Sequence, residues 1–330
     1  MKKALIVMII TVLLSCTLCA CSGNNKSEQA NGLKIVTTIF PEYDWVMNIL
    51  GENAKDADVT MLLDNGVDLH SFQPTAEDIM KISDCDVFIY VGGESDEWVE
   101  DALTQAKNED MKVIDLLEIL GEDVKEEELV EGMEGEEEEE GEKGEEEEEE
   151  EVEYDEHVWL SLRNASKLCS AIKDAIKEAD PSNSEAYEKN AASYIEKLSA
   201  LDEEYKSAVS GSPIKTVLFG DRFPFRYLTD DYELDYYAAF VGCSAETEAS
   251  FETVIFLAGK EDELGLDTIL TIENSDQKIA KTINENTQNA DKEILVMDSM
   301  QSTTSKDVQN GANYLDIMRS NLEVLKKAID

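Results

Sequence analysis

Short runs of β-branched and other apolar residues alternate with segments of helical periodicity along most of the chain. Eight such runs predict buried strands, over residues 34–40, 58–63, 86–91, 112–116, 215–219, 236–241, 268–272 and 293–297. Helical spacing follows most of the strands, over residues 42–50, 75–82, 98–106, 251–264, 276–285 and 313–328. Because strand and helix alternate, we expect an α/β fold whose mostly parallel sheets carry helices on their faces.

A long helical stretch separates the first four predicted strands from the last four. Helical spacing runs from residue 164 to residue 209, with one break at 180–184 that ends one helix and caps the next. The part after the break is about 25 residues, or roughly 37 Å at about 1.5 Å per residue. We therefore expect two similar lobes, residues 34–163 and 211–330, joined by a helical linker over residues 164–210.

A strongly acidic stretch interrupts the first lobe. Residues 122–156 hold 23 acidic and two basic residues, and the whole chain has a formal net charge of −47. Since the like charges repel and few apolar residues are present, we expect a solvated, disordered loop over about residues 122–153. A functional interpretation is an arm that collects cations, and the alternative is a spacer that only improves solubility. The acidic balance excludes nucleic acid as a partner and favours cations.

The N-terminus has the pattern of an export signal. Two lysines precede an apolar run over residues 4–14, which is shorter than the roughly 20 residues of a membrane span. The following Leu-Cys-Ala-Cys at residues 18–21 resembles a bacterial lipobox, which implies a signal peptide over 1–20, a lipid on Cys21 and a tether over 21–33. A competing site at Cys16 and a plain secretory peptide are the alternatives. The resemblance implies an extracytoplasmic protein anchored to the bacterial cell membrane.

The chain has only two histidines, His70 and His157, and they have similar surroundings. Each has an aspartate two positions before it, Asp68 and Asp155 respectively. A single loop histidine is usually structural, but two scarce imidazoles in matching contexts point to a shared role. Neutral imidazoles with carboxylates suit a borderline divalent ion such as Zn²⁺ or Mn²⁺, and the two aspartates could orient the rings.

Three carboxylates lie at the carboxyl ends of predicted strands in the second lobe. These are Asp221, Glu273 and Asp298, and His70 occupies the loop after a strand of the first lobe. In open α/β sheets, ligands bind outside the carboxyl ends of the strands. We expect a metal cleft between the lobes, although an acidic residue at a strand end is often only a solvated helix cap.

The chain resembles the zinc- and manganese-binding substrate-binding lipoproteins of ABC importers over about residues 34–329. The similarity is carried by residues 66–75 around the first histidine, 155–161 around the second, 242–250 in the second lobe, and the long helix. The resemblance implies that His70 and His157 are metal ligands from the first half, that Asp298 is the carboxylate ligand after the last strand, and that the long helix limits lobe motion.

The third ligand of the family does not carry over to this sequence. Members have His or Glu after the strand equivalent to residues 215–219, and the aligned position here is Gly220. Asp221 is the first substitute, and Cys243, Glu273 or a water molecule remain alternatives. Cys243 is one of three cysteines in the body of the chain, with Cys85 and Cys169, and their number and spacing indicate no disulfide framework.

The resemblance implies a lipid-anchored binding protein, not an enzyme, that hands a captured metal to an ABC permease in the membrane. Zinc is the expected ligand, manganese is the alternative, and we expect a monomer. A metal-dependent hydrolase would need an open coordination position and a general base, and no HExxH motif or nucleophile elbow is present. A calcium-buffering or adhesive surface lipoprotein dominated by the acidic stretch is a third hypothesis.

Overall fold

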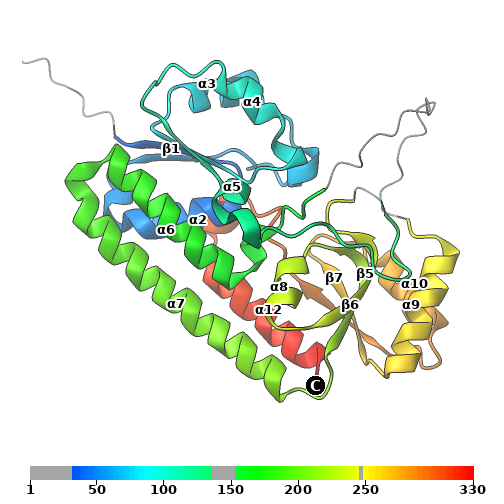
Figure 1. Ribbon diagram of the computed structural model, residues 1–330. Helices are drawn as coiled ribbons and strands as arrows, with labels where there is room; N and C mark the ends of the chain where they lie inside the picture. Colours follow the sequence, from blue (N-terminus) through cyan, green and yellow to red (C-terminus); the bar gives the residue numbers. More distant parts are fainter. Residues whose placement is uncertain (1–31, 136–152, 245–247) are drawn as a thin grey trace, which may run out of the picture. The chain divides into compact units, whose positions relative to one another are not determined.

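The first lobe is built on a sheet of four parallel strands in the order β2-β1-β3-β4 (Figure 1). The computed structural model describes residues 32–135, 153–244 and 248–330, and Leu33–Asp330 form one unit. The strands are β1 Lys34–Thr37, β2 Asp58–Met61, β3 Val87–Tyr90 and β4 Lys112–Asp115. Central parallel strands are covered on both faces, so they need successive apolar residues, as in the fully buried run of Val87, Phe88 and Ile89. The predicted strands are confirmed, with ends up to three residues shorter.

The second lobe repeats this arrangement with the strand order β6-β5-β7-β8, again all parallel. Its strands are β5 Thr216–Phe223, β6 Asp235–Val241, β7 Thr268–Ile272 and β8 Glu293–Met297. Strand β5 extends past the predicted end at residue 219, and its register against β6 shifts between Phe219 and Arg222. Asp221 therefore lies within an irregular part of a strand and not in the loop after it.

The predicted helices form with small changes at their ends, and three short ones were not predicted. The helices of the sheet layers are α2 Phe40–Leu50, α3 Ala76–Ser83, α4 Trp98–Leu103, α9 Phe251–Leu264, α10 Lys278–Asn286 and α12 Tyr314–Ala328. The additional ones are α5 Leu116–Leu120, α8 Arg226–Asp231 and α11 Ser305–Gln309. Helix α3 begins with a capping box at Thr75, whose side chain accepts from the Asp78 N–H.

Two further helices tie the lobes together. Helix α6 spans Leu162–Ala179 and α7 spans Ser184–Gly211, 28 residues or roughly 42 Å. In Figure 1, α7 passes α2 and α6 and continues along α12 of the second lobe. The Tyr194 hydroxyl donates to Asp44 on α2 (2.9 Å), and the Tyr205 hydroxyl donates to the Met318 carbonyl on α12 (2.6 Å). One helix is thus fixed to both lobes by buried contacts.

The acidic stretch is only partly as predicted. The expectation of disorder over residues 122–153 is wrong for residues 122–135, which make specific contacts. Glu126 bridges Tyr154, and Glu134 pairs with Phe240 on β6. Backbone hydrogen bonds from Glu127 to Glu153 and from Glu134 to Ala239 stabilise this segment even though it is acidic. Residues 136–152, which hold most of the glutamates, lie outside the described residues, as does the predicted signal peptide with Cys21.

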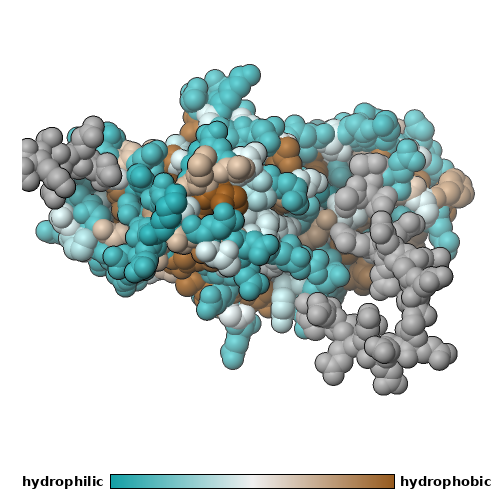
Figure 2. Space-filling model, turned by 90° about the horizontal axis from the view of Figure 1, so that it is seen from above, coloured by the Kyte–Doolittle hydropathy of each residue, from teal (hydrophilic) through white to brown (hydrophobic). Residues whose placement is uncertain are grey.

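Hydrophilic residues cover most of the described surface in the view of Figure 2, with hydrophobic residues in smaller areas between them. In the part of the chain that the structure describes, no helix combines the length and the apolar character needed to cross a membrane. The apolar side chains are instead gathered in a core that is shared by both lobes and in a smaller cluster between the second sheet and helices α9 and α10.

Candidate metal centre

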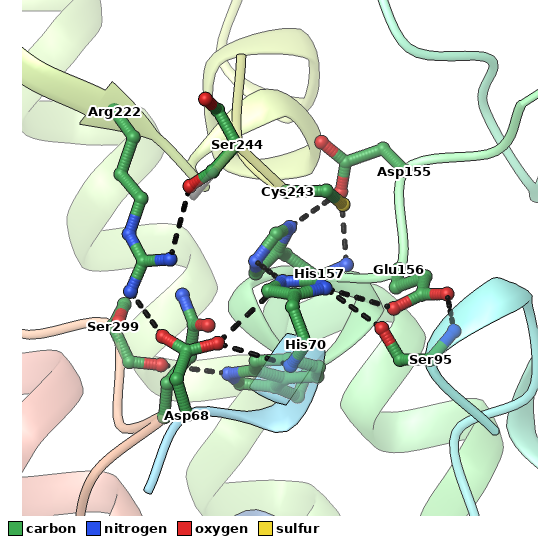
Figure 3. Close-up of polar contacts among 12 residues, drawn as sticks. Asp68, His70, Ser95, Asp155, Glu156, His157, Arg222, Cys243, Ser244 and Ser299 are labelled. Atoms are coloured by element: carbon green, nitrogen blue, oxygen red, sulfur yellow. Dashed lines mark hydrogen bonds and ion pairs between the residues drawn. The ribbon is translucent and has the colours of Figure 1, made fainter. Parts of the chain in front are cut away.

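His70 and His157 meet, although 87 residues separate them in the sequence. Their Nε2 atoms are 3.3 Å apart (Figure 3). His70 lies in a 3₁₀ turn, Leu69–Ser71, in the loop after β2, and Asp68 caps that turn by accepting from the His70 N–H (3.1 Å). His157 lies directly before a second 3₁₀ turn, Val158–Leu160, all of which is buried. The two scarce imidazoles therefore belong to one site, as the sequence predicts.

The other nitrogen of each ring is held by a polar partner. His70 Nδ1 is 2.7 Å from the Ser95 hydroxyl and 3.4 Å from Glu156 Oε2. His157 Nδ1 is 3.1 Å from Asp155 Oδ1, which also accepts from the His157 backbone N–H at 2.9 Å. Since both Nδ1 atoms face acceptors, the neutral rings carry their proton on Nδ1. In that form both Nε2 lone pairs point toward the same place, where one metal ion can bind both.

The charge around the two rings is negative. Burial favours the neutral form of His157, but the carboxylates of Asp155 and Glu156 outweigh it and raise the pKa of His157. Burial also opposes ionisation of Glu156, but hydrogen bonds from His70 and Ser95 prevail and lower the pKa of Glu156. The carboxylates beside the rings therefore favour positive charge between them, as a cation site requires.

The Cys243 thiol is the third donor at this place. Among the described residues, His70, His157 and Cys243 form the group whose possible ligand atoms all lie within 4.8 Å of one another. Gly242 permits the approach, because a Cβ there would lie 3.0 Å from His157 Cε1 and 2.9 Å from the Phe223 carbonyl oxygen. The Cys243 N–H donates to Glu127 (3.3 Å), and burial with the Asp155 and Glu127 carboxylates raises the pKa of the thiol.

The carboxyl end of β5 places the positively charged side chain of Arg222 at the site, where a metal ligand was expected. A Cβ at Gly220 would lie 2.6 Å from the Ala280 Cα on α10, so this position faces the helix packing. The Asp221 carboxylate accepts from the Arg222 N–H (3.0 Å) and the Ile272 N–H (3.4 Å). After the register shift, Arg222 extends to the site and pairs with Asp68 (Figure 3). Burial raises and the guanidinium lowers the pKa of Asp68, and the net pKa is below its usual value.

The loop after β8 presents an amide instead of the expected Asp298. Asp298 accepts from the Met300 N–H (2.8 Å), and burial with the nearby Glu273 raises its pKa to about 7. Glu273 accepts from Ser299 and Gln301 and so fixes the loop. Gln301 is 3% exposed, and when its amide is turned so that the nitrogen donates to Asp68 (3.0 Å), its oxygen lies 3.1 Å from His157 Nε2. Asp221, Glu273 and Asp298 thus have other partners, and Gln301 faces the histidines.

A cavity of 400 Å³ opens beside the histidines. Besides His70 and Cys243, it is lined by Ser95, Tyr154 and the glutamates at 94, 97, 127, 153 and 156. Residues 127 and 153 belong to the two arms of the acidic stretch that the structure describes. The cavity therefore offers an acidic approach to the site, suited to a cation and unsuited to an anionic substrate.

Several residues of the site gave no sequence signal that singled them out. Ser95, Arg222 and Gln301 come from loops or strand ends far from either histidine in the sequence. Glu156 adjoins His157 in the sequence, yet its carboxylate pairs with His70. Adjacency in the sequence does not show which ring Glu156 contacts, because consecutive side chains in an extended segment point in opposite directions.

Comparisons with known proteins agree on one family. A family model described as the periplasmic zinc-uptake complex component A (ZnuA) matches residues 35–328. The zinc-binding lipoprotein AdcA of Streptococcus pneumoniae is 33% identical over 335 residues, covering 100% of this chain and 62% of the relative. The high-affinity zinc uptake system protein ZnuA of Bacillus subtilis is 29% identical over 319 residues, covering 94% of this chain and 92% of the relative.

A solved structure agrees with the fold. The crystal structure of the Zn(II)-bound ZnuA-like domain of Streptococcus pneumoniae AdcA matches with a TM-score of 0.69 and 29% identity, covering 91% of this chain and 99% of that domain. The chain spans about three fifths of the length of AdcA itself. The two-lobed α/β architecture with its long helix is thus the architecture of these zinc-binding proteins.

Proposed function

Because the chain belongs to the family of the zinc-uptake complex component A, we propose that it captures Zn²⁺ between its lobes and delivers it to an ABC-type importer. The ion is the cargo, and His70 and His157 are its first two ligands. The family and the fold are those of metal-binding solute-binding proteins and not of enzymes. The protein would act outside the cytoplasm as a monomer, held to the membrane by a lipid on Cys21.

The separation of the two imidazoles carries this proposal. Two nitrogen ligands about 2.05 Å from a tetrahedral ion lie about 3.3 Å from each other. The observed Nε2–Nε2 distance is 3.3 Å. Both Nδ1 atoms have acceptor partners that set the ring orientation, which is the usual arrangement around metal-bound histidine. The rings are therefore already positioned for one ion before it binds.

The long helix supports capture with little lobe motion. Helix α7 is fixed to α2 in the first lobe and α12 in the second by buried tyrosine hydroxyls. His70 and His157 both precede this helix in the chain, and Arg222, Cys243 and Gln301 follow it. The ligand shell closes when the loops of the second lobe meet the first, and the helix keeps that movement small.

Calorimetric titration of the purified protein with Zn²⁺ and Mn²⁺ tests the proposed cargo. We expect one tightly bound Zn²⁺ per chain that Mn²⁺ does not displace at equal concentration, because imidazole donors favour zinc over manganese. Equal or tighter binding of Mn²⁺ would contradict the assignment. For delivery, a strain that lacks the protein should grow poorly when zinc is chelated, and added zinc should restore its growth.

A variant tests the proposed anchor. Replacing Cys21 with Ala should release the protein from the membrane fraction while its zinc affinity stays unchanged, since the lipid and the site are separate. If Cys21→Ala protein stayed in the membrane fraction, the anchor would lie elsewhere in the chain.

A further inference from the structure

We propose, resting on the proposed capture of zinc, that Cys243 is the third ligand, so that two imidazoles and one thiolate hold the ion. Such a site selects thiolate-binding ions, Zn²⁺ and Cd²⁺, against Mn²⁺. The assignment concerns the position that the end of β5 leaves without a donor: Gly220 faces α10, and Asp221 accepts from backbone N–H groups.

The topology of the second sheet explains how another strand takes over this role. Strand β6 is the neighbour of β5, so the loops after both strands emerge at the same edge of the sheet. Cys243 follows directly after β6, and Arg222 near the end of β5 pairs with Asp68. The ligand that β5 does not supply is thus available one strand away, and the close contact of Gly242 with the His157 ring brings it there.

The distances fit one ion after a small adjustment. With bonds of about 2.05 Å to nitrogen and about 2.3 Å to sulfur, tetrahedral geometry sets nitrogen and sulfur about 3.6 Å apart. One ring nitrogen of each histidine and the Cys243 sulfur already lie within 4.8 Å of one another. A small movement of the Cys243 loop toward the paired Nε2 atoms would complete the N₂S set. With its nitrogen turned to Asp68, the Gln301 amide has its oxygen 3.1 Å from His157 Nε2, in position to be the fourth donor or to hold a water ligand.

Binding exchanges a proton for the ion at sulfur. A Zn–S bond forms as the S–H bond breaks, and the proton passes to Glu127, whose carboxylate accepts from the Cys243 N–H, and from there to solvent. The thiol and His70 both line the cavity, so the ion reaches the sulfur without passing through the core. The carboxylates of Glu127 and Glu156 in the same cavity leave the bound ion in negative surroundings.

Cobalt substitution tests the ligand in the unaltered protein. Co²⁺ bound to a thiolate has an intense near-ultraviolet charge-transfer band, and Co²⁺ bound only by nitrogen and oxygen lacks it. We expect the full chain to show this band and Cys243→Ser to lose it. Because Cys16, Cys19 and Cys21 are unchanged in that variant, loss of the band would assign it to Cys243. A band that persists in Cys243→Ser would overturn the proposal. Cys169→Ala, which removes a buried core thiol, is the matched control and should keep the band.

The Zn²⁺ affinities of the parent chain and of Cys243→Ser distinguish a failure of this proposal from a failure of the proposed function. Loss of a group that merely orients a ligand costs about 10- to 100-fold. Losing a ligand should therefore weaken Zn²⁺ binding by Cys243→Ser at least about 100-fold, with weak Mn²⁺ binding nearly unchanged. If Cys243→Ser bound Zn²⁺ as tightly as the parent, the thiolate ligand would be refuted while zinc capture stood. If the parent chain bound no Zn²⁺, both proposals would fail.

Alkylation gives an answer that does not depend on a variant folding. Iodoacetamide followed by peptide mass mapping should modify Cys243 faster in metal-free protein than in zinc-loaded protein, although the raised pKa of the thiol slows the reaction in both. Cys85 and Cys169 are fully buried and should stay unmodified in both states. Equal modification of Cys243 with and without bound zinc would overturn the proposal.

Discussion

Asp155→Asn isolates the contribution of the carboxylate that orients His157. Asp155 is 2% exposed, and its Oδ1 accepts from both the backbone N–H and Nδ1 of His157. An asparagine oxygen can keep both contacts, so the variant removes mainly the charge. A hydrogen bond to a charged group stabilises by about 1.5–3 kcal/mol against about 0.5–1.5 kcal/mol for a neutral pair. We therefore expect a loss of about 1–2 kcal/mol, or roughly a 5- to 30-fold weaker zinc affinity.

The assay is a calorimetric competition between the protein and a chelator of known zinc affinity. It should be run at about pH 8.5, well above the ordinary pKa of histidine. The reason is that Asp155 also raises the pKa of His157. Without this carboxylate, protons compete less with zinc for the ring at lower pH, and that gain would hide part of the loss in affinity. Asp44→Asn is the control, because Asp44 is a buried carboxylate on α2 that contacts Tyr194 and not the histidines. Unchanged zinc affinity in Asp155→Asn would refute the argument that this carboxylate supports the ligand.

Three further changes test other parts of the account. Gly242→Ala places a methyl group 3.0 Å from His157 Cε1 and should weaken zinc binding at least about tenfold, measured by the same competition, while a matched Gly265→Ala stays near the parent value. Deleting residues 136–151 should leave the calorimetric affinity for the tightly bound zinc unchanged, because the proposed ligands lie outside that segment; a large loss would assign the acidic stretch to the site. Burial raises the pKa of Glu261 to about 8, and its carboxylate has no hydrogen-bond partner among the described residues. The folded protein thus holds this proton more tightly than the unfolded chain, so the free energy of unfolding falls as pH rises from about 4.5 to 8. Glu261→Gln should remove this loss, gaining up to about 3 kcal/mol more at pH 8.5 than at pH 5.5 in urea unfolding; an equal effect at both pH values would contradict it.

The fold could be predicted because its signals are local and long. Buried parallel strands need several successive apolar residues, and the run of helical spacing through residue 209 has no breaker after Pro181. The three helices that were not predicted, α5, α8 and α11, have five or six residues, too few for a periodic pattern to show. The contacts of residues 122–135 were missed because composition describes a segment in isolation and says nothing of the surface that it meets.

The meeting of the two histidines could be predicted from the sequence, and the residue that accompanies them at the third position could not. Scarcity and the paired aspartates indicated that His70 and His157 meet, and Asp155 does contact its ring. Asp68 holds the backbone of its turn, pairs with Arg222 and lies 3.9 Å from His70 Nε2. The third position depends on the direction of the side chains in β5. The register of this strand against β6 shifts between Phe219 and Arg222, and the shift changes which side chains face the cleft. A sequence pattern locates a strand end but does not show which of its side chains faces the cleft.

Zinc binding by the double variant His70→Ala/His157→Ala tests the central claim most directly. In competition titration at about pH 8.5, well above the ordinary histidine pKa, the account predicts one tightly bound Zn²⁺ for the parent and none for the double variant, because both Nε2 donors are gone. Each single variant should retain only weak binding. A double variant that still bound one Zn²⁺ with the affinity of the parent would show that the paired imidazoles are not the site.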